Sequence, residues 1–128
     1  MSRKTVRLLL QIALTDNTFQ PADVRGERVW CGRCIHCRAA LCIGLDGSPW
    51  DGATIEHILP RHHGGTDDVE NLAAACKRCN QGKGTRLDHR KWTDPDLQAM
   101  IQRLRERRAE RWRTPASAPD PLLGRRSR

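Results

Sequence analysis

Residues 76–84 read CKRCNQGKG, a CxxC knuckle that runs directly into an Asn-x-x-Lys-Gly sequence. Two cysteines separated by two residues can turn both sulfurs toward one ion, which is typical of tetrahedral zinc sites. The glycines at 82 and 84 are expected to end a short helix that follows the turn. The segment therefore predicts a metal-bound turn that leads into a short helix.

A second knuckle is available upstream of this one. Three cysteines form two overlapping CxxC units there: Cys31, Cys34 and Cys37. Only one of these pairs can complete a four-thiolate zinc site with Cys76 and Cys79. We favour Cys34 and Cys37, because CIHC resembles a knuckle that turns into a strand, whereas Cys31 follows a tryptophan and is a candidate for burial. The choice between the two pairs stays open at this point.

The composition limits how the chain can be stabilised. Of its 128 residues 38% are hydrophobic, with one Phe and no Tyr, so a large core is not expected and a metal staple is. We find no secretory signal and no apolar run long enough to span a bilayer. We therefore expect a cytoplasmic protein whose cysteines are reduced. Disulfides or a redox pair are the competing interpretation, and Cys42 has no expected partner.

The chain divides into four expected parts. Apolar residues at helical spacing predict a helix over residues 3–14, and turn residues predict a loop over 15–27. β-branched residues predict a strand over 53–59, and capping residues before an apolar stripe predict a helix over 93–113. The parts are an N-terminal helix and loop (1–30), a core with the knuckles (31–86), a basic C-terminal helix (87–113) and a disordered basic tail (114–128).

The 38 residues between Cys37 and Cys76 carry the remaining signal. They contain, in order, Glu56-His57, Gly64-Gly65 and Asn71-Leu72, and Asn80 follows the second knuckle. This order resembles that of the HNH endonuclease family, in the branch whose core is held by zinc, over residues 31–86. Two positions depart from the commonest pattern of the family. Glu56 stands where Asp is more usual, and Asn80 stands where the family name has His.

The resemblance implies a small α+β fold, with a ββα-metal core stapled by a four-cysteine zinc site and flanked by helices. It implies that Glu56 and Asn80 bind the catalytic cation, Mg²⁺ or Mn²⁺. It also implies that His57 is the general base that activates water, and that Asn71 holds the orientation of His57. A bacterial or phage-like setting is the expectation that goes with this family.

Residue chemistry agrees with these roles. Histidine, with an ordinary pKa of about 6.5, accepts a proton at neutral pH. One carboxylate and one amide oxygen suit a hard cation better than zinc and leave positions open for water and phosphate. The side-chain or backbone oxygen of Asn71 can accept the imidazole N–H. Because neighbouring residues of a strand point to opposite faces, we expect an irregularity over residues 56–58.

The charge of the chain indicates the partner. The chain has 23 Lys and Arg against 15 Asp and Glu, a net charge of +8, and an isoelectric point near 9.8. This balance favours nucleic acid ahead of a membrane surface. The expected phosphate contacts are Arg61, His63, Lys77, Arg78, Lys83 and Arg86. His62 and His63 are interpreted as loop residues near the DNA, and the arginine-rich helix as a further hypothetical contact.

We therefore predict a metal-dependent endonuclease that hydrolyses phosphodiester bonds of double-stranded DNA. Its divalent cation is expected to stabilise the leaving 3′ oxygen. The alternative is a non-catalytic zinc module that binds nucleic acid. That module would need the cysteines and the positive charge, but it would not need Glu56, His57 or Asn80. A thiol redox protein is disfavoured, because no thioredoxin-like βαβ pattern accompanies the cysteines.

Overall fold

The computed structural model describes residues 2–123, apart from the side chain of Asp51. Its first element is the helix α1 (Arg3–Thr15), in agreement with the helix predicted over residues 3–14. The hydroxyl oxygen of Ser2 accepts the N–H of Thr5 and so caps the helix. Leu9, Ile12 and Ala13 turn one face of α1 into the protein core.

A four-stranded antiparallel sheet follows, formed by β1 (Gln20–Val24), β2 (Glu27–Arg33), β3 (Ala40–Gly44) and β4 (Pro49–Asp51) in that order. The loop predicted over residues 15–27 was wrong, because β1 lies within it. Arg25 and Gly26 join β1 to β2 with φ angles of 52° and 80°. Two-residue turns of this hand match the twist of the strands, but their usual signal is Asn-Gly or Asp-Gly. Arg-Gly therefore gave no indication of a hairpin.

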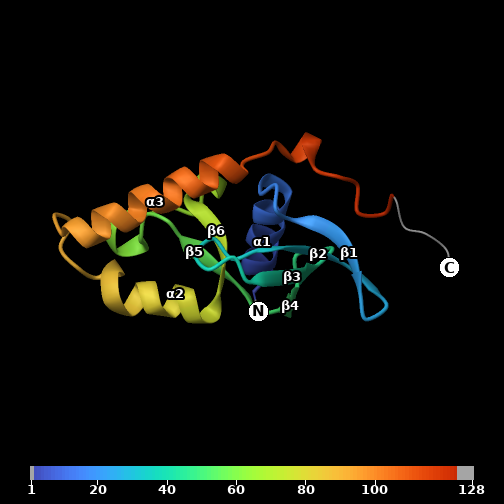
Figure 1. Cartoon of the computed structure of the whole chain (residues 1–128), viewed down its shortest axis with the longest axis horizontal. Coiled ribbons are helices and arrows are strands. Elements are labelled where there is room, and N and C mark those ends of the chain that lie inside the picture. Colours follow the sequence, from blue (N-terminus) through green and yellow to red (C-terminus); the bar gives the residue numbers. More distant parts are fainter. Residues whose placement is uncertain (1, 124–128) are drawn as a thin grey trace.

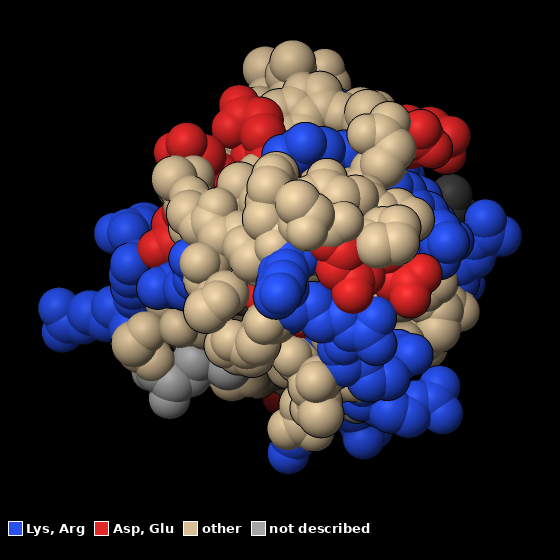
Figure 2. Space-filling view, turned by 90° about the vertical axis from the view of Figure 1, so that its left-hand side faces the viewer, with Lys and Arg blue, Asp and Glu red and all other residues tan. Residues whose placement is uncertain are grey.

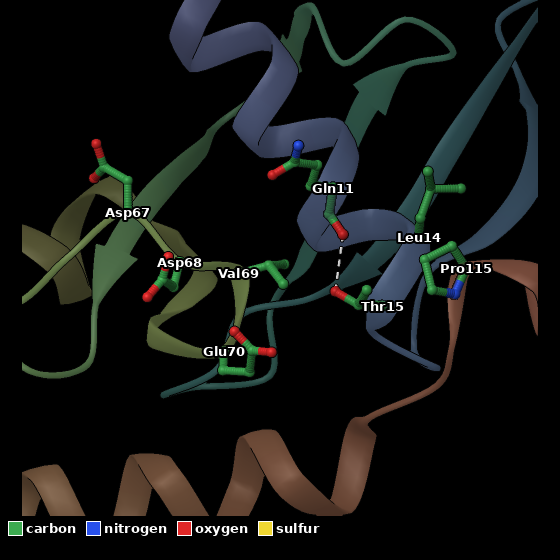
Figure 3. A pocket seen from close by; sticks show the side chains of 8 residues that line it. All are labelled: Gln11, Leu14, Thr15, Asp67, Asp68, Val69, Glu70 and Pro115. Atoms are coloured by element: carbon green, nitrogen blue, oxygen red, sulfur yellow. Dashed lines mark hydrogen bonds between the residues drawn. The ribbon is translucent and has the colours of Figure 1, made fainter.

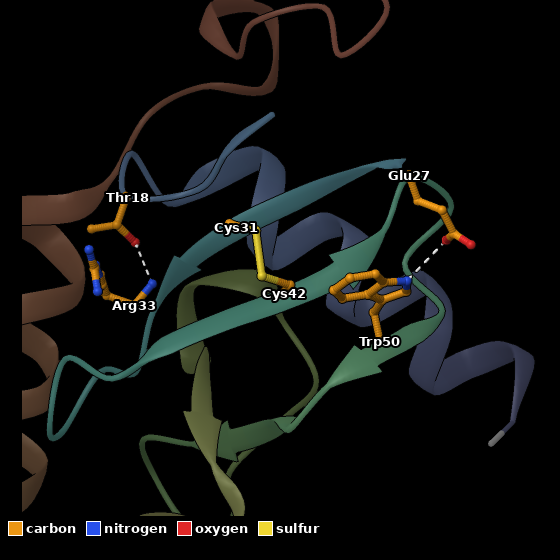
Figure 4. Close-up of a disulfide and its surroundings, with 6 residues drawn as sticks. All are labelled: Thr18, Glu27, Cys31, Arg33, Cys42 and Trp50. Atoms are coloured by element: carbon orange, nitrogen blue, oxygen red, sulfur yellow. Dashed lines mark hydrogen bonds between the residues drawn. A yellow bond between two sulfur atoms is a disulfide. The ribbon is translucent and has the colours of Figure 1, made fainter. Parts of the chain in front are cut away.

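Cys31 on β2 and Cys42 on β3 are directly opposite each other and form a disulfide (Figure 4). This corrects two expectations, that Cys42 has no partner and that all cysteines are reduced. The disulfide also removes Cys31 from the choice of zinc ligands. The four free cysteines are Cys34, Cys37, Cys76 and Cys79.

A second sheet has two antiparallel strands, β5 (Ala53–His57) and β6 (Leu72–Cys76). The short helix α2 (Lys77–Lys83) begins directly after β6 and continues into a wider turn over Gly84–Asp88. α3 (Pro95–Arg111) then runs along one long side of the molecule, past β5, β6 and α2 (Figure 1). It agrees with the helix predicted over 93–113, and Leu97, Ile101 and Leu104 are its buried apolar face.

Three arginines of α3 have a structural role that the sequence did not indicate. The side chain of Arg108 is buried and donates to the carbonyls of Leu72 and Thr15, each at 2.8 Å, and to Thr15 Oγ1 at 2.6 Å. Arg107 and Arg111 donate to carbonyls of residues 33–36. These guanidinium groups join α3 to α1, β6 and the knuckle. They are therefore engaged within the fold rather than lying free along a DNA backbone.

The end of the described chain also differs from the expectation of disorder. A 3₁₀ turn covers Pro115–Ser117, and Arg28 of β2 donates to the carbonyls of Pro121 and Leu123 at 2.8 and 3.2 Å. The remainder of the predicted basic tail, residues 124–128, lies outside the described residues. Within residues 2–123, no helix combines the length and the apolar character needed to cross a bilayer.

Candidate active site

Glu56 and His57 reach one pocket at the end of β5. The pairing of β5 with β6 is regular to its last residue, with Glu56 opposite Ala73 and His57 opposite Leu72. The chain bends at residues 58–59 and reaches Pro60, so the expected irregularity begins after His57 rather than within the strand. A pocket of about 180 Å³ opens there, lined by Glu56, His57, Pro60, Arg61, His62, Asn80, Asp88 and His89.

His57 is held by a carboxylate. Its Nε2 atom lies 2.8 Å from Oδ1 of Asp67 and 3.2 Å from Nε of Arg61. Asp67 in turn accepts from Arg61 at 2.9 Å and pairs with Lys4 of α1 at 2.6 Å. The hydrogen bonds from Lys4 and His57, together with the charge of Arg61, hold the pKa of the Asp67 carboxyl well below its usual range. Arg61 Nε–H also points at Nε2, so the guanidinium and the carboxylate compete for this nitrogen. In the tautomer protonated at Nε2, the ionised Asp67 accepts its hydrogen bond and Nδ1 is the unprotonated, basic nitrogen of the ring.

Asn71 holds the loop that follows β5, a different role from the predicted one of orienting His57. Its Oδ1 accepts the N–H of Leu59 at 2.8 Å, and its Nδ2 donates to the carbonyls of Leu59 and Thr66 at 3.1 and 2.9 Å. Its backbone carbonyl accepts the N–H of Ile58. These bonds fix the loop that follows His57. Among the residues that the structure describes, the predicted hydrogen bond from His57 to Asn71 is absent. His57 contacts Asp67 instead.

The glycine pair in this loop has a steric reason. Gly64 has a φ of 88°, a conformation that disfavours side chains. A Cβ atom at Gly65 would overlap the carbonyl of Leu59, the group that Asn71 also contacts. The turn at residues 64–65, within the long loop between β5 and β6, therefore requires both glycines, and it returns the chain to Asp67 beside His57.

Glu56 is a buried carboxylate whose nearest side chains are His36 and Lys83. Its side chain is 1% exposed, Oε1 lies 2.5 Å from Nε2 of His36, and Oε2 lies 3.8 Å from Nζ of Lys83. Lys83 is equally buried and also contacts Asp88 at 2.6 Å and the carbonyl of His57 at 3.1 Å. Lys83 was expected to bind phosphate. That expectation was wrong, because its ammonium group lies inside the pocket wall.

Asn80 on α2 presents its amide to the same pocket. Nδ2 donates to Oγ1 of Thr54 at 3.0 Å and to the carbonyl of Ile55 at 2.7 Å, which fixes the amide plane against β5. In this orientation the amide nitrogen is engaged in hydrogen bonds to β5, and Oδ1 is the atom available to a ligand. The pocket thus offers one carboxylate and one amide oxygen, a set of donors that suits Mg²⁺ or Mn²⁺.

The free cysteines gather at the start of α2. The sulfurs of Cys34, Cys37, Cys76 and Cys79 all lie within 4.8 Å of one another. Backbone N–H groups donate to Cys34 Sγ and Cys76 Sγ at 3.3–3.4 Å, as suits thiolates. The hydrogen bond from the backbone of Ala39 lowers the pKa of Cys37 to about 7, and burial beside the other thiols raises that of Cys79 to about 12. The knuckle favoured from the sequence is the one beside Cys76 and Cys79.

Comparison with known proteins bears on the same segment. Residues 46–93 match the sequence model of a family described as HNH endonuclease. The chain is also 44% identical over 52 residues to the CRISPR-associated endonuclease Cas9 of Corynebacterium diphtheriae. That alignment covers 38% of this chain and 4% of the Cas9 protein. No solved structure matches the chain significantly.

The predicted DNA contacts around the HNH segment fall into two groups. Arg61, Lys77, Arg78 and Arg86 are exposed, and Lys83 is not. His63 is half-buried and packs against Trp92, with ring centroids 5.4 Å apart, while its Nε2 atom is enclosed. At the end of the molecule that contains the α2–α3 connection, Lys and Arg side chains gather at two sides of the surface (Figure 2). This basic surface is compatible with a phosphate backbone.

A separate, larger hollow has Asp67, the partner of His57, in its wall. It has a volume of about 430 Å³ and lies between α1 and the turn Val69–Asn71 (Figure 3). Its wall includes Asp67, Asp68 and Glu70, and so disfavours a phosphate group. The smaller pocket at His57 is therefore the better candidate for phosphodiester chemistry.

Sequence reasoning missed two residues that contact Glu56 and His57. Asp67 contacts His57 across ten positions, and His36 contacts Glu56 across twenty. His36 lay inside the CIHC knuckle, and Asp67 lay in a polar loop, where neither spacing nor periodicity signals a partner. Pairs this far apart become visible only once the strand pairing is known.

Proposed function

We propose that the chain is a metal-dependent endonuclease that hydrolyses phosphodiester bonds of DNA, with His57 as general base. One observation carries the proposal. A single pocket collects an imidazole oriented by a carboxylate, a second and buried carboxylate, and an amide whose oxygen is spare. The match of residues 46–93 to the HNH endonuclease family supports a nuclease role for the same segment.

His57 activates the attacking water in this proposal. The Asp67 carboxylate takes the hydrogen bond of Nε2, at 2.8 Å, so that Nδ1 carries the lone pair that accepts the proton of water. Asp67 also stabilises the imidazolium that forms, because it keeps its own negative charge. Arg61, whose side chain is 63% exposed, is placed beside both groups and is our candidate for a contact with the scissile phosphate.

The residues present fit a catalytic Mg²⁺ or Mn²⁺. Glu56 and Asn80 would hold it, through a carboxylate oxygen and the amide Oδ1 that the contacts of Nδ2 leave free. When bound, such a cation neutralises charge on the phosphate and on the leaving 3′ oxygen. The core would then be of the ββα-metal kind, in which β5, β6 and α2 surround the site.

The four free cysteines fit a structural Zn²⁺. Four sulfurs at this spacing match the donor set of closed zinc sites, which contribute folding energy directly. The knuckles bracket β5 and β6, and so clamp the strands that carry Glu56 and His57. We infer double-stranded DNA as the substrate from the family and from the exposed basic residues, of which Lys77, Arg78 and Arg86 lie on or just after α2.

The test is cleavage of a supercoiled plasmid by zinc-loaded protein in Mg²⁺ or Mn²⁺. We expect nicked product from the wild type, and a rate at least about 100-fold lower from His57→Ala, since a general base contributes about 10²–10⁴-fold. Binding of the same DNA should be retained by the variant. Binding without cleavage under either cation would favour the non-catalytic zinc module, and equal cleavage by both proteins would remove His57 from the mechanism.

A further inference from the structure

His36 connects the cysteine cluster to the HNH pocket. It lies between Cys34 and Cys37, and its Nε2 atom is 2.5 Å from Oε1 of Glu56. The imidazole is 12% exposed and the carboxylate 1% exposed, so water competes little for this hydrogen bond. A buried carboxylate needs such a partner, because burial without one is costly.

The backbone around His36 is fixed on every side. Its N–H donates to Cys34 Sγ at 3.4 Å, and the N–H of Ile35 donates to the carbonyl of Ala74 on β6 at 2.9 Å. Arg107 of α3 donates to the carbonyls of Ile35 and His36 at 3.1 and 3.3 Å. The position of the imidazole is thus set by the knuckle, by β6 and by α3 together.

We propose that His36 is the positioning residue of Glu56, and that through it the zinc knuckle sets the affinity of the pocket for its divalent cation. This rests on the proposed function, in which Glu56 binds the cation. The imidazole holds Oε1 and thereby fixes the plane of the carboxylate. Oε2 would then be the oxygen left for the cation, and it lies 3.8 Å from Nζ of Lys83.

Lys83 explains why this restraint matters. Glu56 has one more rotatable bond than the Asp that is usual at this position, so its carboxylate can turn in several directions. Without His36 the nearest charged group is Nζ of Lys83, and a closer ion pair with Lys83 would withdraw Oε2 from the pocket. The cation would then have to compete with a buried ion pair.

The experiment compares Mn²⁺ affinity in three zinc-loaded variants, by the electron paramagnetic resonance signal of free Mn²⁺. In His36→Ala we expect the affinity to fall about 10- to 100-fold, the range typical when a residue that orients a metal ligand is lost. His36→Gln, which keeps a donor, should recover part of the loss. Arg33→Gln, which alters an exposed residue beside the same knuckle, should bind as the wild type does. Zinc content should stay near one ion per chain throughout.

The outcomes separate the two proposals. Equal Mn²⁺ affinity of the wild type and His36→Ala, both folded and zinc-loaded, would overturn the role of His36 and leave the proposed function intact. If His36→Ala does not fold, His36→Leu, which fills the space but has no donor, takes its place in the same comparison. Wild-type Mn²⁺ affinity in folded, zinc-loaded His36→Leu would then overturn the role. A wild type that neither binds Mn²⁺ nor cleaves DNA would overturn the proposed function itself.

Discussion

Lys83→Met removes a buried positive charge that lies between two carboxylates. The ammonium group is 2.6 Å from Asp88, 3.8 Å from Glu56 and 3.1 Å from the carbonyl of His57, and the side chain is 1% exposed. Methionine has nearly the same length, so the substitution leaves little empty space. Its main effect is to leave the Glu56 carboxylate, also 1% exposed, without its nearest ammonium group.

The size of the effect follows from burial. Removing one partner of a buried ion pair destabilises a protein by about 3–5 kcal/mol. Asp88 is 20% exposed and can be partly compensated by water, so we expect the lower end, about 3 kcal/mol. For a domain of this size that corresponds to a fall in melting temperature of about 10 °C. Urea unfolding at a fixed zinc concentration measures the difference.

Lys77→Met is the matched control, because Lys77 lies on the same helix and is exposed. We expect it to change the free energy of unfolding by no more than about 0.5 kcal/mol. If Lys77 contacts phosphate, its loss should reduce the slope of log K for DNA binding against log salt concentration by about 1. Equal unfolding midpoints for Lys83→Met and Lys77→Met would refute the assignment of Lys83 to the interior of the pocket wall.

Three further predictions concern other contacts of the fold and of the pocket at His57. Arg108→Leu should destabilise the fold by about 3 kcal/mol, because three short hydrogen bonds to a buried charged group are lost, whereas the exposed Arg105→Leu should leave the urea midpoint unchanged. Asp67→Asn should lower the single-turnover cleavage rate at least about tenfold at saturating Mn²⁺, and Asp68→Asn should not. Lys4→Met should raise the pH of acid unfolding. Asp67 has a lowered pKa in the folded state, so its ionised form stabilises the fold above its unfolded pKa of about 4, and this stabilisation is lost as the pH falls. Without Lys4 the folded-state pKa of Asp67 is less lowered, and the stabilisation is smaller. An unchanged acid midpoint would count against the Lys4–Asp67 pair.

Local signals in the sequence were sufficient for part of the fold. Helical spacing and capping residues indicated α1 and α3, and the CxxC spacing indicated which side chains would gather. These signals act over a few residues, where the geometry of the chain itself sets the distance. The order of Glu56, His57 and Asn80 was also legible, because a family pattern is read along the chain.

Long-range contacts could not be read in the same way. The hairpin at Arg25-Gly26 lacked its usual turn residues, and the Cys31–Cys42 disulfide depends on the pairing that this hairpin begins. Lys83 lies three residues after Asn80 in a basic, polar segment, and only the packing of α2 against β5 shows that its charge is buried. The contact of His57 with Asp67 rather than Asn71 depends on how a glycine turn returns the chain.

The central claim is that cleavage depends on a cation held by Glu56. Its most direct measurement is a titration of the single-turnover rate on a labelled DNA duplex with Mn²⁺, for zinc-loaded wild type and Glu56→Gln. We predict a saturating curve for the wild type and, for the variant, a curve shifted to Mn²⁺ concentrations about tenfold higher or more. Cleavage that is independent of added Mn²⁺ after chelation of loosely bound metal, or identical curves for the two proteins, would contradict the account.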